Sequence, residues 1–105
     1  MADNDRIFIS YAKEDSEIAV KVADRLEDKG YKTWYYSRDS LEYPNMDWMA
    51  LIAKAVIESS AFILFISNNS IDSVMVDKEV NFAIEENKDI FPLFYNITSV
   101  ANVFL

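Results

Sequence analysis

The sequence predicts an α/β domain of the flavodoxin-like type, in which a parallel sheet lies between two layers of helices. Four short apolar runs rich in Ile, Phe and Tyr lack the alternation of half-exposed strands, which is typical of strands covered on both faces. Segments with helical spacing of apolar residues lie between these runs. A strict alternation of strand and helix favours parallel strands joined by right-handed crossovers.

The strands and the first helix follow from these runs. The predicted strands cover residues 7–9, 33–36, 61–66 and 90–95. The first helix has an apolar stripe of Ile18, Val22 and Leu26, at the spacing of one helix face. Gly30 is the only glycine of the chain, and it stands where a helix C-cap is expected.

Two further helices complete the predicted architecture. The second begins its apolar face at Trp48 and continues it to Val56, so Trp48 is expected in the core. The third has a stripe from Val76 to Ile84, and Asp72 is placed to cap its start.

A ligand crevice is expected at the carboxyl ends of the first and third strands. With the strand order 2-1-3-4, the direction of winding reverses between these two strands, and ligands of such sheets bind at that point. Ser10 and Tyr11 end the first strand and Ser67 ends the third. A plain strand end with a tyrosine at the rim explains Ser10 and Tyr11 equally simply, and both interpretations stay open here.

Composition excludes several classes of function. The 105 residues form one small domain with a formal charge of −8, which disfavours nonspecific nucleic-acid binding. Histidine and cysteine are absent, so catalysis has to use carboxylates, lysine, tyrosine or serine, and no metal site is predicted. No apolar run approaches the roughly 20 residues of a membrane span. We therefore expect a cytoplasmic domain without a membrane partner.

Glu79 is the candidate catalytic carboxylate. It lies beside the Val76–Val80 stripe and follows Met75 along the predicted third helix. A carboxylate at the edge of an apolar stripe is partly desolvated, which tends to perturb its pKa. A solvated boundary glutamate is the alternative interpretation.

Three stretches resemble the Toll/interleukin-1 receptor (TIR) domain family, in particular its bacterial members. RIFISYAKEDSEIAVKVADRLEDKGYKTW resembles the first motif and first helix, LEYPNMDWMALIAKAVIESSAFILFIS the next loop, helix and strand, and SVMVDKEVNFAIEENKDIFPLFY the following helix and strand. The resemblance implies a TIR domain over residues 1–105. The family has a fifth strand and a final helix, so the domain is expected to be incomplete at its C-terminal end, with residues 90–95 as an edge strand.

The resemblance also implies a function and a site. Many TIR domains are NAD⁺ glycohydrolases, and their glutamate lies in the pattern Ser, any residue, Trp, three residues, Glu. Ser73, Met75 and Glu79 occupy these positions, with Met75 replacing the usual tryptophan. The implied catalytic residue is Glu79, and the implied substrate-binding residues are Ser10, Tyr11, Tyr36, Arg38, Asp39 and Met75.

The resemblance also implies a substrate and partners. These are NAD⁺ as a substrate, no cofactor, self-association with other TIR domains and a fused or separate sensor module.

The principal alternative to NAD⁺ hydrolysis is a non-catalytic adaptor, in which residues 37–48 form a docking loop. A flavodoxin or receiver domain is disfavoured, because no acidic pair follows the first strand and no glycine-rich phosphate loop is present.

Overall fold

The computed structural model describes residues 5–95 and confirms the predicted architecture, a parallel sheet in the order β2-β1-β3-β4. The strands are β1 (Arg6–Ser10), β2 (Lys32–Trp34), β3 (Ser59–Ile66) and β4 (Asp89–Phe94). The helices are α1 (Ser16–Asp28), α2 (Tyr36–Asp39), α3 (Trp48–Ile57) and α4 (Val74–Glu85). Short 3-10 turns span Lys13–Asp15, Ser40–Glu42 and Ser70–Asp72. The stretch 99–105, expected to follow the fourth strand, lies outside the described residues.

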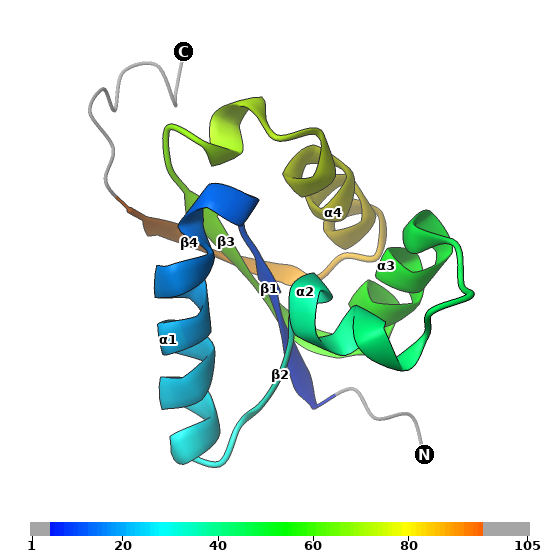
Figure 1. The fold of residues 1–105 in the computed structure, drawn as a ribbon, viewed down its shortest axis with the longest axis horizontal. Helices are drawn as coiled ribbons and strands as arrows, with labels where there is room; N and C mark the ends of the chain where they lie inside the picture. Colours follow the sequence, from blue (N-terminus) through cyan, green and yellow to red (C-terminus); the bar gives the residue numbers. More distant parts are fainter. Residues whose placement is uncertain (1–4, 96–105) are drawn as a thin grey trace.

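Helices cover both faces of the sheet (Figure 1), with α1 on one side and α3 and α4 on the other. Side chains alternate along β1, because successive residues of a strand face opposite sides. Phe8 packs in the cluster beneath α3 and α4, whereas Ile9 packs in the cluster beneath α1. Ser10 therefore projects on the same side as Phe8, toward α4.

The core on the α3 and α4 side is aromatic. Phe8 stacks on Trp34 and on Phe62, each with ring centroids 5.1 Å apart. Trp34 belongs to this cluster and is 2% exposed. The prediction for Trp48 was wrong, because that side chain is 37% exposed.

The position of Trp48 in its helix explains this exposure. The buried stripe of α3 is Leu51, Ile52, Ala55 and Val56. Trp48 is the first helical residue, and side chains in helices lean toward the N-terminus. It therefore projects beyond the stripe that contacts the sheet.

Two helices end in the same backbone motif. Gly30 follows the C-cap residue Lys29 of α1 with φ +94°, and Tyr31 N–H donates to Leu26 O at 3.0 Å. This is the Schellman arrangement, for which glycine is suited by its access to positive φ. The placement of Gly30 at the end of the first helix is thus confirmed, one position past the C-cap. Asn87, with φ 56°, performs the same role after α4.

The second strand is shorter than expected. It ends at Trp34, and Tyr36 begins α2, although the sequence suggested a strand through residue 36 and a loop over 37–48. Side-chain bonds explain the early turn. The backbone N–H of Tyr35 donates to Asp39 Oδ2 at 2.9 Å, and the Arg38 guanidinium donates to the carbonyl of Thr33 at 2.8 Å.

Among the strands of residues 5–95, β4 forms one edge of the sheet. Tyr95 N–H donates to Ile66 O at 2.9 Å, so alternate residues of β4, including Phe91 and Leu93, direct their backbone N–H toward β3. Pro92 consequently faces the outer edge, where its missing N–H costs no bond within the sheet. The proline also removes one donor from that edge and so limits the addition of another strand.

Candidate functional site

The centre of the site is a buried hydrogen bond between β1 and α4. The Ser10 hydroxyl donates to Glu79 Oε1 at 2.7 Å, although the two residues are 69 positions apart. Ser10 is 0% exposed and Glu79 is 2% exposed. The alternative of a solvated boundary glutamate therefore does not describe Glu79, whereas both interpretations of Ser10 and Tyr11 stay open.

Local sequence explains how α4 presents Glu79. The helix begins after Ser73, whose hydroxyl accepts the backbone N–H of Val76 at 3.2 Å. Our expectation that Asp72 caps the helix was wrong, because Asp72 belongs to the preceding 3-10 turn. Starting the helix at residue 74 places Val76, Glu79 and Ala83 on its buried face.

Burial strongly perturbs Glu79. Loss of solvation raises the pKa of its carboxyl to about 8, and the hydrogen bond from Ser10 opposes this rise. Among residues 5–95, no lysine or arginine forms an ion pair with Glu79. A carboxyl with this pKa exchanges its proton near neutral pH, which is a property of functional sites more often than of structural ones.

Tyr11 follows Ser10 in the chain, but its side chain packs on the α1 side of the sheet, with the cluster that contains Ile9 and Tyr35. Its hydroxyl shares a hydrogen bond of 2.7 Å with Ser37 of α2, and its ring meets the edge of Tyr35 at 6.3 Å. Burial is the main reason that the pKa of Tyr11 is raised, with smaller contributions from Tyr35 and from the charge of Glu79. Ser37 was not among the predicted site residues, since nothing in its sequence context distinguishes it from the other serines.

Tyr36 and Met75 pack on the same side of the sheet as Ser10 and Glu79. Both are partly buried against the cluster that contains Phe8 and Trp34. The ring of Tyr36 meets Trp34 edge-on, with centroids 6.4 Å apart. The structure thus brings Ser10, Glu79, Tyr36 and Met75 to one side of the sheet, whereas Tyr11 packs on the other side.

Arg38 and Asp39 lie apart from this group. The Arg38 guanidinium donates to Glu27 at 2.8 Å and to Asp39 at 2.9 Å, and it stacks over Tyr35 at 4.4 Å. Tyr35 packs on the α1 side of the sheet, opposite Glu79. These contacts are sufficient to explain Arg38 and Asp39 as the clamp that holds α2 against β2 and the end of α1.

Asp15 is a second buried acidic residue, which the sequence did not indicate. Asp15 is 5% exposed and accepts hydrogen bonds from Ser67 and Asn69, in the segment after β3. In sequence it is one of several acidic residues around the start of α1, and no pattern singles it out. Ser67, expected at the end of the third strand, directly follows β3.

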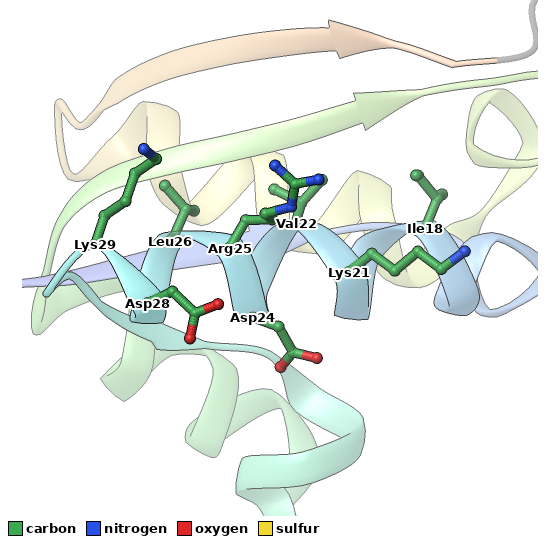
Figure 2. Close-up of a pocket in the computed structure, with 8 residues that line it drawn as sticks. All are labelled: Ile18, Lys21, Val22, Asp24, Arg25, Leu26, Asp28 and Lys29. Atoms are coloured by element: carbon green, nitrogen blue, oxygen red, sulfur yellow. The ribbon is translucent and has the colours of Figure 1, made fainter.

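A hollow of the surface lies elsewhere, along α1 (Figure 2). It is an open groove of about 520 Å³ with apolar side chains facing the strands, and its lining includes Ile18, Val22, Leu26, Lys21, Arg25 and Lys29. None of the predicted site residues lines it. We therefore assign the candidate site to the Ser10–Glu79 pair, on the other side of the sheet.

In the described part of the chain, no group of three or more acidic side chains is arranged to hold a metal ion. Among those same residues, no helix combines the length and the apolar character needed to cross a membrane.

Solved structures with similar folds are TIR proteins. The TIR domain of the Toll-related receptor TRR-2 from Hydra magnipapillata has a TM-score of 0.81 and 25% identity, over 93% of this chain and 76% of its own length. The metazoan TIR-STING receptor from C. gigas has a TM-score of 0.70 and 26% identity, over 84% of this chain. This chain spans only 30% of that receptor.

A third structure shows the fold at lower identity, and the family model covers nearly the whole chain. The TIR domains of the activated Roq1 resistosome have a TM-score of 0.77 at 21% identity, over 86% of this chain and 57% of theirs. A search of curated proteins gives no significant match. The family model described as TIR domain matches residues 7–103. The chain therefore belongs to the TIR domain family.

Proposed function

We propose that this TIR domain hydrolyses NAD⁺ at the bond between nicotinamide and ribose, with Glu79 as the catalytic carboxylate. The observation that carries the proposal is the buried Ser10–Glu79 hydrogen bond at the carboxyl end of β1. Ligands of doubly wound sheets bind at this edge, where the strand order reverses between β1 and β3. The TIR family includes NAD⁺ hydrolases as well as adaptors, which agrees with this site.

The chemistry suits the residues that are available. The bond between C1′ of the ribose and the pyridinium nitrogen breaks with its electron pair going to nicotinamide, which leaves as a neutral molecule without protonation. A water molecule then forms the new C1′–O bond and releases one proton. The transition state resembles an oxocarbenium ion, so a nearby carboxylate stabilises its developing positive charge. This reaction requires neither histidine nor cysteine, and the chain contains neither.

The proposed substrate contacts surround Glu79. Ser10 orients the carboxylate, while Tyr36 and Met75 provide apolar and aromatic surface for the nucleotide. Tyr11 is a weaker candidate, because it packs on the α1 side of the sheet. Met75 offers a flexible thioether where the enzymes of the family have an aromatic ring. Arg38 and Asp39 are retained as weaker candidates, because each already has partners within the clamp at α2.

The proposed setting is an immune or cell-death response. The resemblance to bacterial TIR domains supports an antiphage role in the cytoplasm, with NAD⁺ loss as the output. In this proposal, a sensor module brings several TIR domains together.

A second candidate function is a non-catalytic adaptor, and a specific observation favours it. Glu79 is only 2% exposed, whereas the segment from the end of α2 into the first turn of α3 exposes large apolar side chains. These are Leu41, Tyr43, Met46, Trp48 and Met49. Such side chains suit a docking surface for another TIR domain.

One assay separates the two functions. The protein is incubated with NAD⁺ at high concentration, alone and fused to a scaffold that clusters it, and free nicotinamide is measured. Release of nicotinamide by the clustered protein supports hydrolysis. Its absence in both forms, with NAD⁺ intact, favours the adaptor.

A further inference from the structure

Asp15 does not form the side-chain capping hydrogen bond that is usual at its position. It stands at the N-cap of α1, where an aspartate usually accepts a backbone N–H of the first helical turn. Its side chain makes no such bond. The two carboxylate oxygens instead accept the Ser67 hydroxyl and, at 2.9 Å, the Asn69 side-chain amide.

The bond to Asp15 organises the turn that precedes α4. Ser67 Oγ accepts the backbone N–H groups of Asn69 and Ser70, both at 3.1 Å, and Ser67 N–H donates to Ser70 Oγ at 2.8 Å. Because the single hydroxyl proton of Ser67 goes to Asp15, the lone pairs of that oxygen are free to accept both N–H groups. The Asp15 carboxylate thus fixes the orientation of the Ser67 hydroxyl, on which the hydrogen bonds of this turn depend.

The two ends of this network lie on the two segments that carry the candidate site, the segment after β1 and the segment that leads into α4. Asp15 lies on the segment that leaves β1 just after Ser10, and the turn at Ser67 leads through Ser73 into α4, which carries Glu79. Strands β1 and β3 are neighbours in the sheet. A link between their exit segments therefore holds Ser10 and the start of α4 in a constant relation.

We infer that Asp15 is a positioning residue for Glu79, which acts by tying the exit of β1 to the turn before α4. This inference rests on the proposed role of Glu79. The hydrogen bonds of the Asp15 side chain join it to Ser67 and Asn69, and not to Ser10 or Glu79. Its effect on Glu79 therefore passes through the turn and α4. Burial of both Asp15 and Ser67 makes the link rigid, since water does not compete for these bonds.

The test follows the Glu79 carboxyl directly by carbon-13 NMR titration, without NAD⁺. In Asp15→Ala, α4 loses its anchor and water reaches Glu79, so we expect its carboxyl to titrate lower by about one pH unit or more. Asp15→Asn is the conservative variant. Its amide oxygen still accepts from Ser67, and its NH₂ group can donate to the Asn69 amide oxygen after that amide rotates. We expect it to restore a titration close to wild type.

Ser59→Ala is the matched control. Ser59 is 1% exposed and donates to Ala55 O at 2.7 Å, at the opposite end of β3, so its loss also removes one buried hydrogen bond. It should lower the melting temperature without moving the Glu79 titration. If Ser59→Ala moves the titration as much as Asp15→Ala does, or if Asp15→Ala leaves it unchanged, the inference is overturned.

A further variant and a separate activity measurement complete this test. Should Asp15→Ala fail to fold by circular dichroism, Asn69→Ala removes only one of the two bonds and is judged by the same two outcomes. Nicotinamide release is measured separately. If wild type releases none, the proposed function fails, while the titration still decides whether Asp15 positions Glu79.

Discussion

The hydroxyl of Ser10 donates to the carboxyl of Glu79 at 2.7 Å, in a place where neither side chain is appreciably exposed. This one contact joins the end of a central strand to the middle of a facing helix. No cationic side chain among residues 5–95 forms an ion pair with Glu79. Burial and the hydrogen bond from Ser10 therefore set the protonation state of its carboxyl.

We expect Glu79→Gln to abolish most nicotinamide release while leaving the fold intact. Glutamine keeps the size of the side chain and removes the charge that faces the cationic sugar. A loss of about 3–4 kcal/mol of transition-state stabilisation lowers the rate by roughly two to three orders of magnitude. Glu85→Gln, an exposed change on the same helix, is the control and should retain full activity. Equal rates for wild type and Glu79→Gln would show that the site is misassigned.

The stability of the wild-type protein should fall as pH rises from about 4.5 to about 8. In this window the unfolded chain has ionised Glu79, whereas the folded protein still binds the proton because burial raises the pKa to about 8. The unfolded state therefore binds fewer protons, and the free energy of unfolding decreases by up to about 1.4 kcal/mol per pH unit.

Glu79→Gln isolates this effect, because it removes the titrating group and preserves the other carboxylates. Urea unfolding at several pH values should give a difference between the two proteins that grows toward pH 8. A difference that is independent of pH would mean that Glu79 titrates normally in the folded protein.

Ser10→Ala should move the pH dependence of activity upward. The Ser10 bond lowers the pKa of Glu79, so its removal raises that pKa further above its ordinary value. If the ionised carboxylate is the active form, kcat/KM rises with pH through this pKa, and the variant reaches half of its maximal value at a higher pH. Ser60→Ala, at the other end of β3, should leave the profile in place. An unshifted profile in Ser10→Ala would separate the hydrogen bond from catalysis.

The two tryptophans should differ sharply in their contributions to stability. Trp34 is 2% exposed and stacked on Phe8, so Trp34→Ala should lower the free energy of unfolding by about 3–5 kcal/mol. Trp48 is 37% exposed, and Trp48→Ala should cost less than about 1 kcal/mol. Denaturant titration of both variants checks this. Comparable losses would contradict the burial difference.

Self-association should make activity depend on concentration. If clustering of TIR domains assembles the active form, nicotinamide release per molecule rises as the protein is concentrated. We would measure it over a wide dilution series and follow oligomeric state by light scattering. Constant specific activity, together with a monomer throughout, would argue against clustering as the switch.

The amino-acid pattern alone determined the sheet. Four apolar runs without alternation, separated by helical stripes, predicted parallel strands joined by right-handed crossovers. The order 2-1-3-4 came with the flavodoxin-like type that this alternation suggested, and it is the order observed. The end of α1 at Gly30 was also readable, since a positive φ strongly favours glycine. Helical spacing further placed Glu79 beside a buried stripe.

Only the tertiary structure decided how deeply Glu79 is buried and what it touches. Its donor, Ser10, is 69 residues away, and the contact depends on how two crossovers bring β1 under α4. The same holds for the two tryptophans, of which Trp34 is buried and Trp48 is exposed. It holds also for Asp15, whose side chain accepts from Ser67 and not from the first turn of its own helix. Local patterns specify which face of an element is apolar. Which polar side chains meet across that face depends on contacts between distant segments, and these become defined only when the sheet is assembled.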